Sequence, residues 1–307
     1  MKAVVALAGG VGAAKFLRGL VRIVSPQNLM IVGNTGDDLE LYGLHISPDL
    51  DIVMYTLAGV VDETKGWGIK NDTYNTLNML GRLGLETWFK LGDRDLATHI
   101  IRTKMLREGM TLSQTTTQLC RMFGVKPKLT PMTNQKVRTK IRSGKQTLDF
   151  QEYFVKNQTK NDVTNVVYQG AADADPTPGI IEALNQANQI VVCPSNPFLS
   201  IGPMLAIPKI RKAILERRSD TVAISPIVAG KTIKGPADRI LASMGCDASV
   251  RGVAEYYKGF ISRIVIDSAD SAWKTKLERT GLEVTVADTV MKCLEDSAQL
   301  AQITLNY

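Results

Sequence analysis

The stretch from Lys2 to Leu20 reads KAVVALAGGVGAAKFLRGL and decides the fold class. Val4 to Leu7 is a short apolar run rich in β-branched residues, which predicts a buried strand. Gly9, Gly10 and Gly12 follow at once, and apolar residues then recur at helical spacing. A strand, a glycine turn and a helix form a phosphate-binding arrangement. The turn lets the backbone approach a diphosphate closely, and the helix N-terminus offers unpaired N–H groups.

This glycine turn differs from two well-known nucleotide motifs. It lacks the G-x-G-x-x-G of a dinucleotide fold and the G-x-x-x-x-G-K-[ST] of a P-loop. The missing fingerprint argues against an NAD-dependent dehydrogenase. A tight turn between strand and helix with no ligand stays an alternative to a phosphate site.

Composition limits the classes of partner. The chain has 307 residues, 44% of them hydrophobic, which is enough for one large or two modest domains. Its 37 basic and 30 acidic residues give a net charge of +7, and the cations are scattered along the chain. Such a diffuse positive charge suits an anionic substrate better than a nucleic acid. Aromatic residues make up only 6%, which argues against platforms that stack single-stranded bases.

The cysteine pattern and the N-terminus indicate a cytoplasmic protein. Cys120, Cys193, Cys246 and Cys293 are widely spaced and match neither a zinc site nor a redox pair, so we expect reduced thiols. The N-terminus carries no signal-peptide pattern. No apolar run reaches membrane-spanning length, so we expect no membrane association.

A second loop rich in turn residues should lie beside the glycine turn. Asn28 to Val32 is predicted as a strand, and it runs into a loop that contains Asn34, Asp37 and Asp38. Ligands of parallel sheets bind at the carboxyl ends of the strands. A glycine-rich and an acidic loop would therefore face one crevice.

A helix start follows this loop. Ser47, Pro48 and Asp49 combine a cap residue, a proline in the first turn and an early acid. Asp51 and Tyr55 are four residues apart and would share one face of that helix.

The sequence pattern changes in the middle of the chain. A polar segment that contains glycines precedes helices predicted to begin near Asp93 and Thr111. Residues 136–155 are predicted as a β-hairpin. We therefore predict an inserted cap of helices and a β-hairpin over residues 70–160.

Alternating strands and helices then resume, starting with a predicted core strand at Val163 to Tyr168. Residues 1–69 and 161–307 would form one Rossmann-like nucleotide-binding core. The predicted fold class is α/β, a doubly wound, mostly parallel sheet with a helical and β-hairpin cap insertion.

Two later loops also follow predicted strands. PSNPFLSIGP at 194–203 is fixed by prolines, and its Ser195, Asn196 and Gly202 offer small polar contacts. Lys231 and Lys234 stand among glycines in the next such loop, at positions suited to phosphate. A solvated basic loop is the alternative for these two lysines.

Taken together, seven segments closely resemble one family. They occur in the order GGVGAAK, GNTGDD, ISPDLD, WGIKNDT, LGDRDLATHIIR, PSNPFLSIGP and SPIVAGKTIKGPAD. They are similar to the 2-phospho-L-lactate transferases (CofD/FbiA) of deazaflavin coenzyme F-420 biosynthesis, and the likeness runs over nearly the whole chain.

The resemblance implies a reaction and its partners. The acceptor is the deazaflavin Fo (7,8-didemethyl-8-hydroxy-5-deazariboflavin). The donor is a guanosine diphosphate ester of lactate, or of enolpyruvate in some members, and GMP leaves. Mg²⁺ is required, and a homodimer is expected. Such chemistry needs positioning and charge neutralisation more than a covalent nucleophile.

The same resemblance assigns site residues. Asp51 matches the acid that contacts the deazaflavin, and Lys90 matches the lysine before L-G-D-R-D; both are the expected catalytic residues. The predicted ligand-binding set, mostly on the nucleotide side, also includes Gly9, Gly10, Gly12, Asn34, Ser195, Asn196, Gly202 and Lys231. For Mg²⁺ we favour Asp38 and Asp51, because carboxylates from adjacent loops can hold a cation that keeps several waters. Asp37 and Asp49 remain alternatives.

A second function class competes with the transferase. The broader superfamily includes regulatory proteins with a similar glycine loop, so a non-catalytic nucleotide or nucleotide-sugar sensor is the alternative. A sensor would not need the cap segment with Lys90 and LGDRD.

Overall fold

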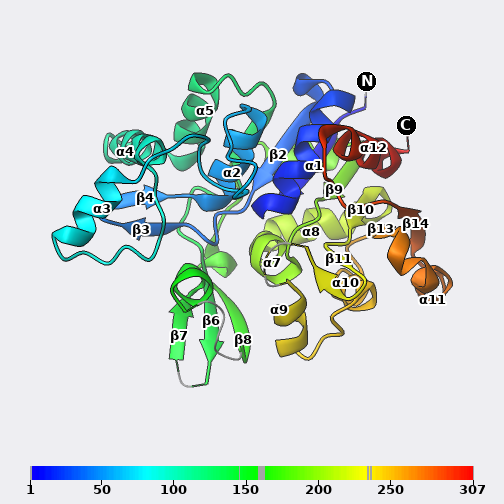
Figure 1. Cartoon of the computed structure of the whole chain (residues 1–307). Coiled ribbons are helices and arrows are strands. Elements are labelled where there is room, and N and C mark those ends of the chain that lie inside the picture. The colour runs from blue at the N-terminus through cyan, green and yellow to red at the C-terminus, as the bar shows by residue number, and fades with distance from the viewer. Residues whose placement is uncertain (1, 145, 158–162, 234, 236, 307) are drawn as a thin grey trace.

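A seven-stranded sheet forms the centre of the molecule (Figure 1). The computed structural model describes residues 2–144, 146–157, 163–233, 235 and 237–306. The strands of the sheet are β1 (Val4–Ala8), β2 (Leu29–Gly33), β5 (Lys128–Pro131), β9 (Gln189–Val192), β10 (Thr221–Ile224), β13 (Arg263–Asp267) and β14 (Glu283–Ala287). Every neighbouring pair runs parallel.

The strand order locates a ligand crevice. The order is β14-β13-β10-β9-β1-β2-β5, so the chain builds outward from β1 in one direction and then from β9 in the other. This is the doubly wound arrangement, in which the order reverses between β1 and β9. In sheets of this kind, ligands bind in a crevice outside the carboxyl ends of these two strands. The predicted α/β fold with a parallel sheet is confirmed.

Helices cover both faces of the sheet. One face packs against α1 (Gly10–Ile23), α2 (Pro48–Leu57), α5 (Leu112–Met122) and α12 (Leu294–Leu305). The other packs against α6 (Ile180–Gln186), α7 (Gly202–Leu205), α8 (Pro208–Glu216), α9 (Ala237–Ser243), α10 (Val250–Tyr256) and α11 (Lys274–Glu278). Outside these layers lie α3 (Asn75–Arg82) and α4 (Asp93–Arg107), on the left of Figure 1.

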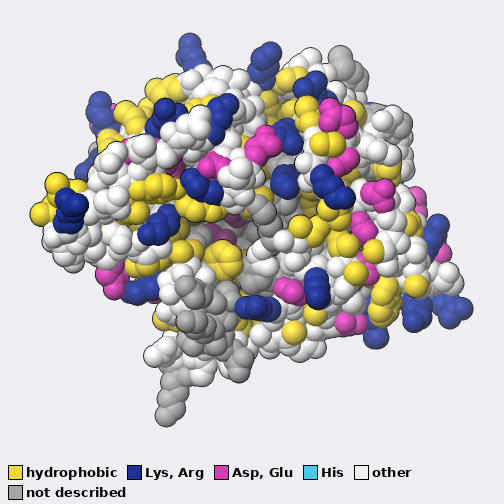
Figure 2. Space-filling model, in the orientation of Figure 1, with side chains coloured by type: hydrophobic (Ala, Val, Ile, Leu, Met, Phe, Trp, Pro, Cys, Tyr) yellow, Lys and Arg dark blue, Asp and Glu magenta, His cyan; other side chains and the backbone are white. Residues whose placement is uncertain are grey.

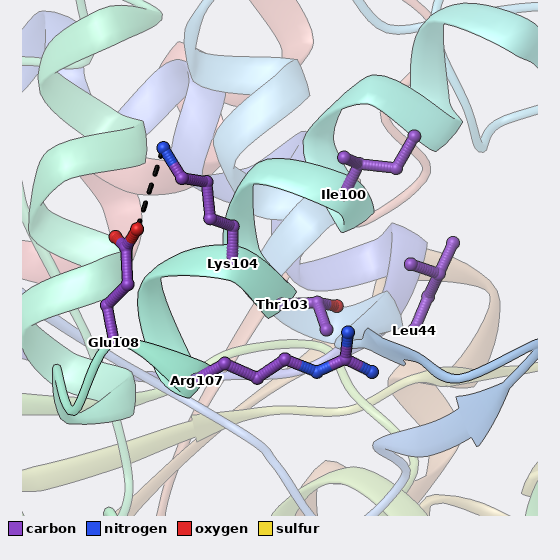
Figure 3. A pocket seen from close by; sticks show the side chains of 6 residues that line it. All are labelled: Leu44, Ile100, Thr103, Lys104, Arg107 and Glu108. Carbon is purple, nitrogen blue, oxygen red and sulfur yellow. Dashed lines mark ion pairs between the residues drawn. The ribbon is translucent and has the colours of Figure 1, made fainter.

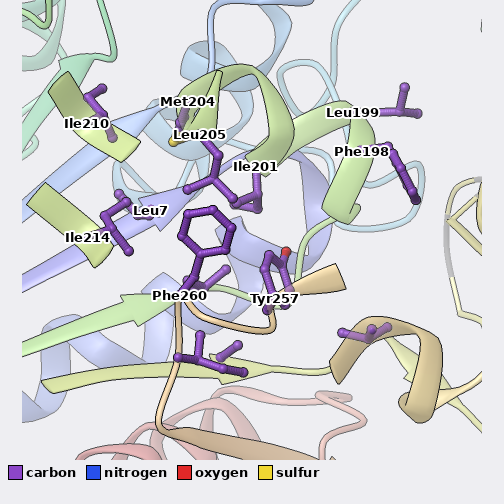
Figure 4. Close-up of a cluster of buried hydrophobic side chains, with 14 of the residues drawn as sticks. Leu7, Phe198, Leu199, Ile201, Met204, Leu205, Ile210, Ile214, Tyr257 and Phe260 are labelled. Carbon is purple, nitrogen blue, oxygen red and sulfur yellow. The ribbon is translucent and has the colours of Figure 1, made fainter. Parts of the chain in front are cut away.

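Alternation along β1 explains the two layers. Val5 and Leu7 belong to the hydrophobic cluster on one face, whereas Val4 and Ala6 belong to the cluster on the other. A strand buried on both faces is continuously apolar, as the N-terminal sequence is. Figure 4 shows part of the first cluster, with Leu7 among side chains of α7 and α8.

Two strands differ from the predicted domain division. Val163 to Tyr168 was predicted as a core strand, but it contributes to β8 (Asn165–Gln169), which pairs antiparallel with β6 (Arg138–Ser143). Together with β7 (Gln146–Asp149) these strands form a separate small sheet. Conversely, β5 lies inside the predicted cap range, yet it pairs with β2 at the edge of the main sheet. The cap is therefore divided into a helical part before β5 and a small sheet after it.

Short hairpins were not anticipated from the sequence. β3 (Leu39–Leu41) and β4 (Leu44–Ile46) pair across a turn in which Tyr42 and Gly43 both have positive φ. β11 (Ile227–Val228) and β12 (Lys231–Thr232) form a second hairpin. Each of these strands is too short to show a clear alternation of apolar and polar residues.

The surface agrees with the diffuse charge of the sequence. Figure 2 shows lysine and arginine side chains spread over the visible face, with acidic side chains between them. Within the described residues, no helix combines the length and apolar character that a bilayer crossing requires.

The packing of α1 on α12 yields a stability prediction. A Cβ atom on Gly19 would overlap the backbone of Ser297 and Ala298 in α12. Gly19→Ala should therefore lower the free energy of unfolding by about 1–3 kcal/mol, the usual cost of overpacking a core. Urea denaturation measures this change. Gly81→Ala on exposed α3 is the control, because its Cβ would meet only Thr87 side-chain atoms, at 3.3 Å or more. Equal stabilities of the two variants would contradict the tight α1–α12 contact.

Candidate active site

The loops after β1 and β9 meet where the strand order reverses. A Cβ on Gly12 would overlap the carbonyl oxygen of Pro194, so this glycine lets α1 approach the loop after β9. A Cβ on Gly9 would lie 2.5 Å from Asp49 Oδ2 and 2.6 Å from Ser200 Cβ. The glycine turn is thus enclosed by α2 and by the PSNPFLSIGP loop.

Asp49 joins three of these segments. Its Oδ1 accepts a hydrogen bond of 2.9 Å from the backbone N–H of Gly10, and its Oδ2 accepts one of 2.9 Å from Asn34 Nδ2. An acid at a helix N-terminus is favourable because it faces the positive end of the helix dipole. The carboxylate therefore holds the start of α1, the β2 loop and the start of α2 together.

Asn34 organises the same loops from the other side. Its Nδ2 also donates to the carbonyl oxygen of Leu199 at 3.2 Å, and its Oδ1 accepts from the Gly36 N–H at 2.8 Å. Asn34 was predicted to bind the ligand. In the structure its amide group bonds to protein atoms, so the side chain fixes the shape of the crevice.

Asp38 has one occupied oxygen and one unpaired oxygen. Ser47 Oγ donates to Asp38 Oδ2 at 2.9 Å, and His45 Nε2 lies 3.0 Å from the same oxygen. The Oδ1 atoms of Asp38 and of its neighbour Asp37 are buried without a hydrogen-bond partner among the described residues. Unpaired buried carboxylate oxygens are costly, which points to a group that these oxygens bind.

Burial and neighbouring charge raise the pKa of two carboxyl groups in this region. Burial raises the pKa of Asp37 well above its usual value, and the neighbouring carboxylates of Asp49 and Asp38 raise it further. Burial also raises the pKa of Asp49 to about 6, against the hydrogen bonds from Asn34 and Gly10. Burial and the neighbouring charge therefore disfavour ionisation of Asp37 and Asp49.

Other buried polar atoms without a partner belong to the loops after β2 and β9. In the described part of the chain they include Thr35 Oγ1, Ser195 Oγ and Asn196 Nδ2. The orientation of Asn196 is fixed, because its Oδ1 accepts from the backbone N–H groups of Phe198 and Leu199 at 3.0 and 3.1 Å. The loops after β2 and β9 thus present acceptors and donors to the same crevice.

The small sheet forms part of the surroundings. The Thr139 N–H of β6 donates to the Gly36 carbonyl oxygen at 2.7 Å. Tyr168 Oη of β8 donates to the Phe198 carbonyl oxygen at 2.7 Å, next to Gly202. A Cβ on Gly202 would overlap the Tyr168 ring, so this glycine serves packing.

Asp51 lies on another side of α2 from Asp49. Arg102 donates to both of its carboxylate oxygens, through Nη1 to Oδ2 at 3.0 Å and through Nη2 to Oδ1. Both residues are buried, at 4% and 1% exposure. A carboxylate whose two oxygens already bind a guanidinium cation is a poor metal ligand or base. The catalytic and metal-binding roles of Asp51 stay predictions, and the unpaired oxygens of Asp37 and Asp38 make these two acids better candidates for holding a cation.

The two predicted lysines lie on exposed segments. Lys90 stands between α3 and α4, and Lys231 is in β12. Among the described residues, neither forms a hydrogen bond or ion pair with the loops of the crevice. Lys234 lies outside the described residues.

Sequence reasoning missed Arg102 and His99. Asp95, His99 and Arg102 are spaced i, i+4 and i+7 on α4, so they share one face of the helix. Polar residues on a buried helix face are a signal that spacing alone would have shown. The outer side of α4 has a different character, with a hollow of about 340 Å³ lined by Leu44, Ile100, Thr103, Lys104, Arg107 and Glu108 (Figure 3).

Comparison with known families agrees with the architecture and the loop motifs. The family described as 2-phospho-L-lactate transferase CofD matches residues 4–302. The chain belongs to the 2-phospho-L-lactate transferase family. The resemblance of the seven motifs is confirmed, and this transferase is an enzyme and not a sensor alone.

Named relatives of this transferase fall into two groups. A phosphoenolpyruvate transferase from Kitasatospora aureofaciens is 40% identical over 309 residues, covering 98% of this chain and 96% of the relative. A 2-phospho-L-lactate transferase from Methanosarcina mazei is 38% identical over 297 residues, covering 97% of each chain. Both groups match the transferase over nearly its full length.

A solved structure shares the fold of this transferase. A member of the UPF0052 family from Bacillus halodurans superposes with a TM-score of 0.66 and covers 99% of this chain and all of its own. The two sequences are 17% identical, so the likeness concerns the fold alone.

The bonds of Asn34 yield the second prediction. Asn34→Ala removes three hydrogen bonds and leaves the Gly36 N–H and the Leu199 carbonyl without that partner. We expect the free energy of unfolding to fall by about 1–3 kcal/mol or more, the cost of unpaired buried polar groups. Chemical denaturation measures the loss. Asn78→Ala, on the exposed side of α3, is the matched control and should change little. A stability equal to that of the control would remove Asn34 from its organising role.

Proposed function

We propose that this enzyme transfers a 2-phospholactyl or an enolpyruvyl phosphate group to the deazaflavin Fo in coenzyme F-420 biosynthesis. The donor is the corresponding guanosine diphosphate-linked ester, and GMP is released. The observation that carries the proposal is that two loops joined by a hydrogen bond carry unpaired buried polar atoms, on Thr35, Asp37, Asp38, Ser195 and Asn196. They belong to loops on either side of the point where the strand order reverses. A homodimer, which the family resemblance also implies, belongs to the same proposal.

The reaction is a displacement at phosphorus. The terminal hydroxyl oxygen of the Fo side chain forms a bond to the phosphorus that bears the lactate or enolpyruvate. The bond from that phosphorus to the bridging oxygen breaks, and GMP leaves with the electron pair. We assign the hydroxyl proton to Asp49, because a carboxyl group with a pKa of about 6 is suited to accept a proton near neutral pH.

Donor groups around the crevice suit a diphosphate. The Ser195 hydroxyl, the Asn196 amide and the Thr35 hydroxyl are buried, and these polar atoms have no partner in the described part of the chain. Hydrogen bonds to charged oxygens are stronger than those between neutral groups. We assign these three side chains to the phosphate oxygens. Lys90 and Asp51 remain the residues predicted to face the acceptor.

The acidic loop fits Mg²⁺. Mg²⁺ is usually held by one or two carboxylates, with water and substrate phosphates completing an octahedron. No group of three or more His, Cys, Asp or Glu side chains is arranged for a metal within the described residues. The unpaired Oδ1 atoms of Asp37 and Asp38 supply two ligands of the required kind. When bound there, Mg²⁺ would neutralise charge on the phosphates.

Metal binding can be tested without turnover. Asp38→Asn removes one charge but keeps the shape, so it should reduce the rise in melting temperature that Mg²⁺ causes relative to EDTA. The wild type should show this rise, because a ligand that binds only the folded state stabilises it. Differential scanning fluorimetry over a Mg²⁺ titration measures both. Asp149→Asn, in β7 of the small sheet, is the control. Identical titrations for Asp38→Asn and wild type would contradict the assignment.

The donor must be identified by its product. Purified enzyme with Fo, Mg²⁺ and either the lactate or the enolpyruvate donor should give a phosphodiester of Fo and GMP in equal amounts. Mass spectrometry separates the two products, because they differ by two hydrogens. The wild type should turn over one donor at least about 10-fold faster, as expected for a site that reads the difference by differential transition-state binding. Absence of both products, with folded enzyme, would refute the proposed function.

A further inference from the structure

A buried ion pair joins the cap helix α4 to helix α2 of the core. Arg102 is 1% exposed, and its two terminal nitrogens both donate to Asp51. A guanidinium and a carboxylate removed from water are costly, and removing one partner leaves an uncompensated buried charge. Apolar residues of similar volume would join two helices at less cost. We therefore infer that the pair serves a role that needs α4 and α2 held in a fixed relative position.

Other polar side chains extend this contact. His99 Nδ1 lies 3.1 Å from Arg102 Nη1, and His99 Nε2 lies 3.3 Å from Asp95 Oδ1. Tyr55 Oη donates to Asp95 Oδ1 at 2.7 Å. The face of α4 that carries Asp95, His99 and Arg102 thus meets the face of α2 that carries Asp51 and Tyr55. The contact has a defined register, because each bond joins a specific pair.

Helix α2 is held from two sides at its first turn. Asp49 bonds to the glycine turn through Gly10 and to Asn34, as described above. Two residues later, Asp51 bonds to Arg102 on the other side. A shift of α2 toward or away from α4 would therefore move the Asp49 carboxylate within the crevice.

Helix α4 also reaches the acidic loop. Thr103 Oγ1 donates to the His99 carbonyl oxygen at 2.7 Å and accepts from the His45 N–H at 2.8 Å. The His45 ring in turn lies against Asp38 Oδ2. Adjacent residues of α4, Arg102 and Thr103, thus connect to Asp51 and to Asp38.

We propose that Arg102 is a positioning residue for the transfer reaction. It fixes α2 so that Asp49 faces the crevice. It also binds both oxygens of Asp51, which prevents this carboxylate from binding the cation. The proposal rests on the proposed function. It opposes the prediction that Asp51 itself binds the metal or takes the proton.

A double-mutant cycle separates positioning by the Arg102–Asp51 pair from a direct role of Asp51 in binding metal or taking the proton. Asp51→Asn leaves the buried Arg102 charge without its carboxylate, and Arg102→Gln leaves the Asp51 carboxylate without its guanidinium, with the His99 ring 3.7 Å away. The double variant D51N/R102Q instead replaces the ion pair by two neutral amides. We expect each single variant to lose about 100-fold in kcat, the scale of a small misplacement in an active site. The double variant should recover at least tenfold of that loss, with donor KM changing less than kcat.

The Mg²⁺-dependent rise in melting temperature provides a readout that does not need turnover. It should shrink in R102Q and return in D51N/R102Q. Arg107→Gln is the matched control, because Arg107 lies on the same helix, is exposed and, among the described residues, donates to the Gly43 carbonyl oxygen alone. Arg107→Gln should behave as wild type in both assays.

Several results would overturn the role of Arg102. A folded double variant as inactive as Asp51→Asn alone would show that the Asp51 carboxylate itself contacts metal or substrate. Folded single variants with wild-type kcat and KM would show that the pair has no part in catalysis. If the glutamine variant does not fold, Arg102→Lys keeps the charge but loses the two-pronged bond, and a normal kcat for that variant would overturn the proposal. Failure of the proposed function is distinct, because wild-type enzyme would then release no GMP.

Discussion

The Asp49 carboxylate is the point on which the arrangement of the crevice depends. It bonds to the first N–H of α1 and to the amide of Asn34, so three chain segments far apart in sequence converge on one side chain. The negative charge is stabilised by the helix N-terminus, which accounts for its place there. Burial works in the opposite direction and raises its pKa to about 6. The fold thus holds an acid where its charge is only partly compensated.

The distribution of buried charge divides the acids into two sets. Asp51 of α2 and Asp95 of α4 lie at the contact between these two helices, where Arg102, His99 and Tyr55 are their partners. Asp37, Asp38 and Asp49 lie toward the crevice, and of these Asp37 and Asp38 each have a buried oxygen without a partner in the described chain. Burial and the charge of neighbouring carboxylates raise the pKa of Asp37 and of Asp49. A cation, together with hydroxyl and amide donors, would relieve that repulsion for the second set only.

Much of the fold could be predicted because its signals are local. β1, α1, α2, α4 and α5 all lie where strand pattern, proline and acid caps indicated. The pairing of β8 with β6 could not be predicted, because a short alternating strand is compatible with either sheet and its partner is more than twenty residues away. β5 was missed as a core strand for the same reason.

The site was predictable as a set of loops but not as a set of contacts. The sequence located the glycine turn, the acidic loop and the PSNPFLSIGP loop at strand ends, and a parallel sheet brings such ends together. It could not reveal that Asp51 would meet Arg102, since these residues are 51 positions apart and approach only through packing of α4 on α2. Asp49 and Asp51 both lie in the first turn of α2. Because they are two residues apart, they point to different sides of the helix and have different partners.

The glycines of the motif illustrate how a sequence pattern can have two physical causes. A glycine next to a phosphate leaves room for the ligand, whereas the space beside Gly9, Gly12 and Gly202 is filled by Asp49 and Ser200, by Pro194 and by Tyr168. These glycines let segments of the protein approach one another, and Gly10 alone among the four has a positive φ, of 74°. Under the proposed function, recognition of a diphosphate would fall to side chains such as Ser195 and Asn196. Because their loop can approach α1 only where residue 12 has no side chain, the motif would act on the ligand through the convergence of the loops.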